Sequence, residues 1–151
     1  MDDADILIVE DNRHDAELIL EALDGLDIGD RVRAIYDGVE ALDYFFSPEG
    51  LLKKAGARLP KLLLLDLKLP KMSGLEILSR IKSDERTMDV PAVIFTSSSE
   101  SQDRIESYRL GANSYIVKPM DADMFSRYVL DIGKYWLSVN TTICDGGVPR
   151  P

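Results

Sequence analysis

The sequence predicts an α/β fold with a doubly wound, five-stranded parallel sheet. Five short apolar runs alternate with longer segments in which apolar residues recur every three or four positions. The expected strands cover about residues 5–10, 31–36, 61–66, 91–96 and 113–117. Strands and helices that alternate in this order favour right-handed crossovers, which place helices on both faces of a mostly parallel sheet.

Helical spacing defines five segments between and after these strands, at about 14–26, 39–46, 73–81, 100–110 and 121–138. Ser73 is expected to cap the third helix, and Glu76, three residues later, completes a capping box. Gly111 suits the left-handed turn that ends the fourth helix. Residues 47–60 are expected to form a surface insertion with room for one helical turn.

The chain of 151 residues is long enough for one domain, which should bury roughly 70% of the surface exposed by the unfolded chain. We expect residues 1–138 to form this domain. Residues 139–151 are expected to form a partly disordered C-terminal tail and no output domain, because residues 145–151 are rich in Gly and Pro.

Composition excludes several classes of function. The 27 acidic and 18 basic residues give a formal charge of -9, which disfavours nucleic acid and anionic membranes as partners. No apolar run approaches the roughly 18 residues of a spanning helix, and the first residues lack signal-peptide features. A cytoplasmic protein is therefore expected. The single cysteine, Cys144, and the single histidine, His14, disfavour a disulfide framework, a Cys or His metal site and a Ser/His/Asp triad.

Polar residues stand where the apolar runs end. Glu10 and Asp11 close the first expected strand, Asp66 the third and Thr96 the fourth, and Lys118 follows the fifth. Ligands of open α/β sheets bind in the crevice outside the carboxyl ends of the strands. The sequence thus predicts three carboxylates, a hydroxyl and an ammonium group at one edge of the sheet.

Three neighbouring carboxylates need a cation, because two unit charges about 4 Å apart repel by about 4 kcal/mol at an effective dielectric constant of about 20. Oxygen ligands without His or Cys favour a hard ion, and a site with room for water and phosphate oxygens favours Mg²⁺ over Ca²⁺. An aspartate bound to a metal, beside a lysine and a hydroxyl, suits phosphoryl transfer. Asp66 would be the nucleophile and form an aspartyl phosphate.

Together these residues resemble the receiver domain of two-component response regulators. The motifs that carry the resemblance are Glu10-Asp11, Asp66 with Leu69-Pro70 and Ser73-Gly74, Thr96-Ser97, and Lys118-Pro119. The resemblance covers about residues 4–138 and implies the flavodoxin-like (βα)5 fold. It implies a phosphorelay module rather than an enzyme, which takes a phosphoryl group from a sensor histidine kinase on Asp66 and acts on a downstream protein or phosphotransfer partner. Self-phosphorylation from a donor and autodephosphorylation are the only reactions it implies.

The resemblance also assigns the metal ligands. Mg²⁺ would be held by Asp11, Asp66 and the backbone carbonyl of Lys68, and Glu10 would assist through water. No other cofactor is implied. These assignments come from the family pattern and not from the spacing of the residues.

Phosphoryl binding and switching are assigned in the same way. Thr96 and Lys118 would bind the phosphoryl oxygens, and Tyr115 would turn inward as Thr96 moves. The peptide bond between Lys118 and Pro119 is usually cis in the family, although only about 5–6% of X-Pro bonds in folded proteins are cis.

A narrower resemblance is to the single-domain receivers that work with cyanobacterial and other bacterial phytochromes. It rests on Asn12 after the acidic pair, on residues 110–115, and on Tyr135-Trp136-Leu137 late in the last helix. The insertion at 47–60 also fits this group, because it is longer than in chemotaxis-type receivers.

The last helix has an apolar face that is wider than a contact with one sheet requires. This width, and the only tryptophan of the chain near the helix end, predict a homodimer interface. Its candidate residues are Phe125, Tyr128, Ile132, Tyr135 and Trp136.

Other functions stay open on the residues alone. A receiver-like scaffold could signal without phosphate. A phosphohydrolase of the haloacid dehalogenase type also uses an aspartate at a strand end, but it needs a second Asp two residues later, where this chain has Lys68. FMN binding lacks the expected phosphate loop after the first strand. His14, beside Arg13 and Asp15, is expected to be exposed and not to transfer phosphate.

Overall fold

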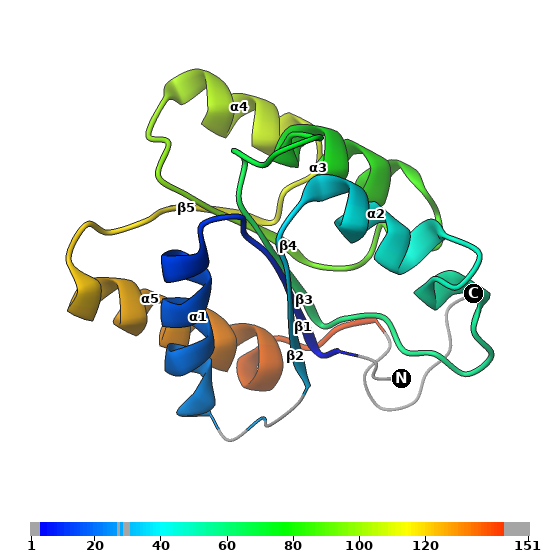
Figure 1. The fold of residues 1–151 in the computed structure, drawn as a ribbon, viewed down its shortest axis with the longest axis horizontal. Coiled ribbons are helices and arrows are strands. Elements are labelled where there is room, and N and C mark those ends of the chain that lie inside the picture. The colour runs from blue at the N-terminus through cyan, green and yellow to red at the C-terminus, as the bar shows by residue number, and fades with distance from the viewer. Residues whose placement is uncertain (1–3, 27, 29–30, 144–151) are drawn as a thin grey trace.

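The computed structural model describes residues 4–26, 28 and 31–143. Within them, five parallel strands form one sheet in the order β2-β1-β3-β4-β5 (Figure 1). The strands are β1 (Ile6–Val9), β2 (Val32–Ile35), β3 (Leu62–Leu65), β4 (Ala92–Thr96) and β5 (Ser114–Val117). Each lies inside its expected range, so the predicted parallel sheet is confirmed.

Five α-helices cover the two faces of this sheet. They are α1 (Arg13–Asp24), α2 (Gly38–Phe46), α3 (Gly74–Ser83), α4 (Ser101–Arg109) and α5 (Ala122–Lys134). Figure 1 shows α1 and α5 on one face and α2, α3 and α4 on the other. The doubly wound architecture is therefore confirmed.

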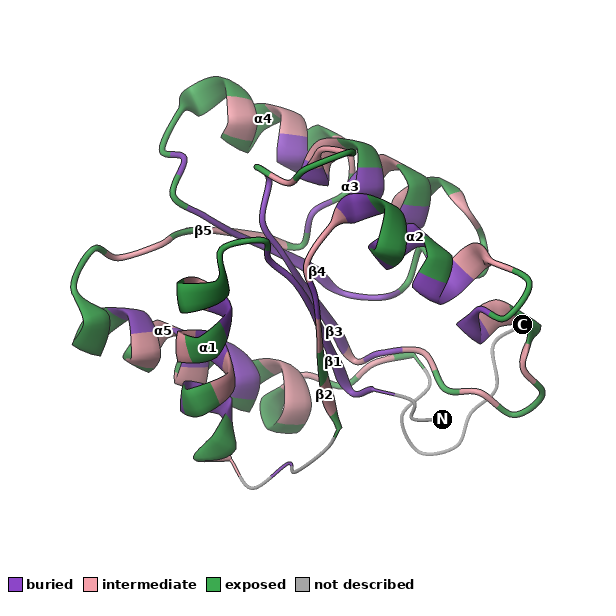
Figure 2. Ribbon diagram, in the orientation of Figure 1, coloured by how far each residue is buried: buried purple, intermediate pink, exposed green. Residues whose placement is uncertain are grey.

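The three inner strands, β1, β3 and β4, are buried on both faces, which explains why they are nearly continuous apolar runs (Figure 2). Successive side chains of a strand point to opposite faces. Leu7 and Val9 pack in the cluster with α2 and α3, whereas Ile6 and Ile8 pack in the cluster with α1 and α5. The carboxyl ends of β1 and β3 are thus held between two hydrophobic layers.

Side chains cap the helices that start near this edge. The Asn12 Oδ1 atom accepts a hydrogen bond from the backbone N–H of Asp15 and begins α1. The Ser73 Oγ atom accepts one from the backbone N–H of Glu76 at 3.3 Å, which confirms the predicted cap of α3. Gly111 has a φ of 107°, as expected for the turn after α4.

The insertion at 47–60 contains one short 3₁₀ helix, Leu51–Lys53, and Leu51 is buried against the core. After α5 the chain continues as a short π-helical segment, Tyr135–Val139. Of the tail predicted for residues 139–151, Val139 ends this segment, and residues 144–151, including Cys144, lie outside the described residues. Among the described residues, no helix is both long enough and apolar enough to span a bilayer.

Two of the predicted interface residues are core residues instead. Phe125 is 3% exposed and Ile132 is 6% exposed, and both pack against the sheet with Phe95 and Val129. The interface prediction is wrong for these two because α1 lies alongside α5, so the wide apolar face of α5 meets both the sheet and a helix.

The other three candidates differ in exposure. Tyr128 is half-buried, and Trp136 is half-buried against the same core. Tyr135 remains 47% exposed. Their contribution to an interface stays a prediction.

Candidate functional site

Three carboxylates meet at the carboxyl edge of the sheet. Glu10 and Asp11 follow β1, and Asp66 follows the neighbouring strand β3. One oxygen of each carboxylate lies within 4.8 Å of the others, and Glu10 and Asp66 are buried whereas Asp11 is exposed. The structure therefore brings together the acidic residues that the sequence placed at this edge.

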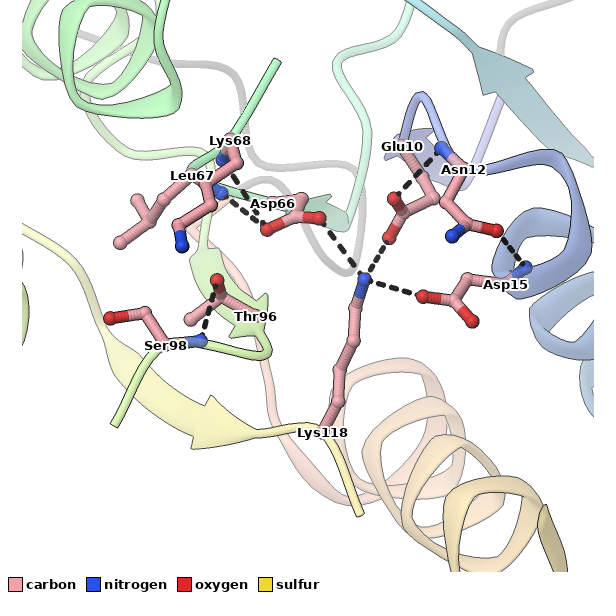
Figure 3. A network of polar contacts seen from close by, with 9 residues as sticks. All are labelled: Glu10, Asn12, Asp15, Asp66, Leu67, Lys68, Thr96, Ser98 and Lys118. Atoms are coloured by element: carbon pink, nitrogen blue, oxygen red, sulfur yellow. Dashed lines mark hydrogen bonds and ion pairs between the residues drawn. The ribbon is translucent and has the colours of Figure 1, made fainter. Parts of the chain in front are cut away.

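Lys118 provides the positive charge at this edge. Its Nζ atom lies 2.6 Å from Glu10 Oε1, 3.0 Å from Asp66 Oδ2 and 2.9 Å from Asp15 Oδ2 (Figure 3). An ammonium group has three hydrogens, and here each has a carboxylate partner. Only 7% of the lysine side chain is exposed, so these charges interact in a largely water-free setting.

Asp15 was missed as a site residue in the sequence. It lies in the first turn of α1, which begins immediately after β1. The signal available in the sequence was the spacing between Asn12 and Asp15. Because Asn12 caps α1, the side chain three residues later lies in the first turn and reaches Lys118 at the strand end. That placement depends on where the helix starts, which the predicted range of 14–26 did not fix.

Burial and neighbouring charges shift the pKa values of Glu10 and Lys118. Burial alone would lower the pKa of Lys118, but its hydrogen bonds to Glu10 and Asp15 and the charge of Asp66 raise it above its ordinary value. Burial, together with the charge of Asp66, raises the pKa of Glu10 to about 7, despite the opposing effect of Lys118. Lys118 thus stays charged while Glu10 can take up a proton near neutral pH.

This shift predicts a pH-dependent stability. The pKa of Glu10 is 4.5 in the unfolded chain and about 7 in the folded protein. Between about pH 5 and 7, Glu10 therefore holds its proton in the folded protein and has lost it in the unfolded chain. The free energy of unfolding should therefore decrease as pH rises through this range, by on the order of 2 kcal/mol. Urea unfolding at a series of pH values, with EDTA to keep metal ions away from the carboxylates, measures this decrease. Glu10→Gln should remove most of the decrease, and an unchanged slope in that variant would contradict the assignment.

The backbone after β3 fixes the orientation of the Asp66 carboxylate. Its Oδ1 atom accepts hydrogen bonds from the backbone N–H groups of Leu67, at 2.7 Å, and Lys68, at 3.5 Å. Its Oδ2 atom faces Lys118. Asp66 thus has one oxygen held by amides and the other directed toward the cationic centre, while the carbonyl of Lys68 as a metal ligand stays a prediction.

Thr96 and Tyr115 are linked through Ser98. Thr96 is buried at the end of β4, and its Oγ1 atom accepts a hydrogen bond from the Ser98 N–H at 3.3 Å. The Tyr115 hydroxyl donates to the Ser98 carbonyl at 2.9 Å, and the Ser98 hydroxyl donates to Asp103 Oδ2 of α4 at 2.6 Å. Ser98, to which the sequence gave no linking role, therefore connects β4, β5 and α4.

One backbone expectation is wrong. The Lys118–Pro119 peptide is trans, as are the other peptide bonds of the described residues. The trans form is the favoured one for most X-Pro bonds, and with it the Lys118 N–H still donates to the Thr96 carbonyl at 2.7 Å while Nζ reaches Asp66. His14 lies at the start of α1 and is exposed, as expected.

Comparison with known families decides the classification. The family model of the response regulator receiver domain matches residues 6–129, which include the acidic pair, Asp66 and Lys118. The chain belongs to this family. Receivers are signalling domains that work with histidine kinases, so the resemblance seen in the sequence is confirmed.

Two curated relatives of this receiver align along most of their length. The probable methanogenesis regulatory protein FilR2 of Methanothrix harundinacea is 42% identical over 135 residues, which cover 89% of this chain and 84% of the relative. The response regulator Rcp1 of Synechocystis is 34% identical over 136 residues, which cover 90% of each.

Solved structures agree with this relation. The phosphorylated cyanobacterial phytochrome response regulator RcpA is 39% identical with a TM-score of 0.82, covering 91% of this chain and 96% of that one. The Mn²⁺-bound form of Rcp1 is 34% identical with a TM-score of 0.80 and the same coverage. The chain is thus a receiver related to phytochrome response regulators, with the receiver fold.

The acidic edge of this receiver fits a divalent cation. Its three carboxylates offer oxygen ligands only, and they converge within a few ångströms beside one lysine. Hard divalent ions such as Mg²⁺ prefer this ligand chemistry. Receiver domains bind a divalent metal at this pocket, as the Mn²⁺-bound structure of Rcp1 illustrates for a relative.

Proposed function

We propose that this receiver accepts a phosphoryl group on Asp66 from a sensor histidine kinase, with Mg²⁺, and signals through a change of its interaction surface. The position of Asp66 carries this proposal. It follows the central strand of the sheet, between the acidic pair after β1 and Thr96 of β4, with Lys118 against its Oδ2 atom. The similarity to phytochrome response regulators supports a bacterial phytochrome as the kinase.

In this proposal Asp11, Asp66 and the Lys68 carbonyl hold Mg²⁺, with Glu10 assisting. When bound, the metal neutralises negative charge on the carboxylates and the phosphoryl oxygens. A carboxylate oxygen of Asp66 attacks the phosphorus atom, and the bond from phosphorus to the nitrogen of the kinase histidine breaks. The leaving imidazole keeps the electron pair of that bond and is neutral once it holds one proton.

Thr96 and Lys118 then contact the new phosphoryl group. The Thr96 hydroxyl hydrogen can donate to a phosphoryl oxygen while the Oγ1 atom still accepts from the Ser98 N–H, so a shift of Thr96 toward Asp66 would also draw on the loop at Ser98. Ser98 in turn binds the hydroxyl of Tyr115 and the carboxylate of Asp103. Phosphorylation would therefore bias the position of this loop, of Tyr115 and of α4, as a two-state switch requires.

Intact-protein mass spectrometry after incubation with acetyl phosphate tests the function. With Mg²⁺ we expect a gain of one phosphoryl group, and with EDTA in excess we expect none, because Asp66 would then attack the donor without charge neutralisation. A gain that is equal with and without Mg²⁺ would contradict the proposed site. Absence of any gain, also when BeF₃⁻ causes no change, would favour a phosphate-independent scaffold.

The phosphohydrolase alternative has its own measurement. Its second aspartate would stand at position 68, and the structure has the exposed side chain of Lys68 there. Steady turnover of small phosphate esters by the wild-type chain would support that alternative. We expect none beyond slow loss of the phosphoryl group from Asp66.

We also propose that the receiver acts in the cytoplasm as a homodimer that uses exposed apolar side chains near α5. Met124 is 44% exposed, Tyr135 is 47% exposed and Val139 is 68% exposed. Sedimentation velocity should show a dimer at micromolar concentration, and Tyr135→Asp should weaken it roughly tenfold by burying a charge. Tyr108→Asp, which changes an equally exposed tyrosine on α4, is the control. A monomeric wild type would refute the dimer.

A further inference from the structure

Asp15 differs from the other two carboxylates that bind Lys118. Glu10 and Asp66 belong to the three-carboxylate group that fits a divalent metal, and Asp15 does not. Its Oδ2 atom nevertheless lies 2.9 Å from Lys118 Nζ, about as close as that of Asp66. In Figure 3 its side chain reaches the ammonium group from α1, on the side away from Asp66.

The position of Asp15 is fixed by the start of its helix. Its backbone N–H donates to the Asn12 Oδ1 atom at 3.0 Å, which sets the first turn of α1. Its side chain is 23% exposed, so water reaches one part of it while the other faces Lys118. The carboxylate is therefore held beside the ammonium group by local helix geometry, independently of the metal group.

A bound metal and Lys118 would draw on two of the same carboxylates. Lys118 contacts Glu10 and Asp66, which the divalent ion would also draw on. Two cations a few ångströms apart repel each other. A metal at this edge would thus weaken the contacts of Lys118 with Glu10 and Asp66, whereas its contact with Asp15 lies outside the metal group.

We propose that Asp15 is a positioning residue for Lys118, which keeps the ammonium group beside Asp66 when metal and a phosphoryl group occupy the edge. This inference rests on the proposed phosphorylation of Asp66. The carboxylate of Asp15 stabilises the lysine in a place where it can contact the phosphoryl group without displacing the metal. Without Asp15, Lys118 depends entirely on the carboxylates that the metal needs.

Calorimetric titration of Mg²⁺ tests the proposal without any phosphoryl donor. Asp15→Asn should weaken Mg²⁺ binding by roughly fivefold in the otherwise wild-type chain, because Lys118 then competes harder for Glu10 and Asp66. In the Lys118→Ala background the same substitution should change the affinity little. An equal loss in both backgrounds, or none in either, would overturn the proposal, since Asp15 would then act only through its charge or not at all.

Two further variants separate positioning from charge and from folding. Glu17→Gln removes one exposed acidic charge from the same helix and should leave the Mg²⁺ affinity close to that of the wild type. Asp15→Glu keeps a carboxylate within reach of Lys118 and should restore most of the affinity. Failure of this rescue, while thermal unfolding of the variant matches the wild type, would also count against positioning.

Phosphorylation gives an independent readout. At saturating Mg²⁺, labelling of Asp15→Asn by acetyl phosphate should be several-fold slower than that of the wild type, and Asp15→Glu should label at close to the wild-type rate. If the wild type is not labelled at all, the proposed function fails while the Mg²⁺ titration still decides the role of Asp15. The two failures are therefore distinguishable.

Discussion

Asp66→Asn is expected to abolish labelling of the receiver by acetyl phosphate and Mg²⁺. The amide keeps the size of the carboxylate, so its Oδ1 atom can still accept from the Leu67 N–H. It lacks the negative oxygen that attacks phosphorus, however, and contributes no charge to the metal group. Intact-protein mass spectrometry should show one phosphoryl group on the wild type and none on this variant.

Two observations make this result specific. Asp43→Asn changes an exposed aspartate of α2, away from the acidic edge, and should label like the wild type. The Asp66→Asn protein should remain folded, because it also removes a buried charge that repels Glu10. Full labelling of a folded Asp66→Asn protein would show that another side chain accepts the phosphoryl group.

Gly74→Ala is expected to destabilise the receiver strongly. A Cβ atom at Gly74 would overlap the backbone carbonyl oxygen of Asp66 and lie 2.7 Å from the Leu67 Cα atom. The Gly74 N–H also donates to the Leu67 carbonyl at 2.9 Å, which ties the start of α3 to the loop after β3. Because backbone cannot move aside as a side chain can, we expect a loss of about 3 kcal/mol in the free energy of unfolding.

Thermal unfolding should show the loss as a decrease of roughly 10 °C in Tm. Ser73→Ala is the matched control, because it removes only the cap of the same helix and should cost about 1 kcal/mol. Displacement of the loop after β3 should in addition slow labelling of Asp66 in the Gly74→Ala protein. An equal stability for the two variants would mean that the loop absorbs the added carbon atom at little cost.

The sheet and the acidic edge followed from the sequence because they depend on local patterns. A strand of apolar residues only, such as Leu62–Leu65, has to be buried on both faces of the sheet. The parallel arrangement then brings the carboxyl ends of neighbouring strands together. Asp66 and Lys118, which are far apart in the sequence, therefore meet at one edge. The helix caps at Ser73 and the turn at Gly111 depended on neighbours within a few residues and were predicted equally well.

The errors and omissions concern contacts between elements. Phe125 and Ile132 were placed at an interface because periodicity shows how wide an apolar face is, but not how many neighbours cover it. Asp15 and Ser98 were missed because their roles lie in hydrogen bonds between elements, which depend on the start of α1 and on the loop after β4. The spacing of Asp15 from Asn12 is informative only once the start of α1 is known, and the bonds of Ser98 leave no spacing pattern in the sequence.

The position of β5 divides the receiver into a stiff part and a compliant part. β3 is central, and its residues are buried on both sides, whereas β5 pairs only with β4 among the described strands and its residues are half-buried or exposed. Amide protons should consequently exchange slowly in β3 and much faster along the outer side of β5. The acceptor aspartate thus follows the most enclosed strand, while Tyr115 lies on an edge strand whose outer side is open to a binding protein.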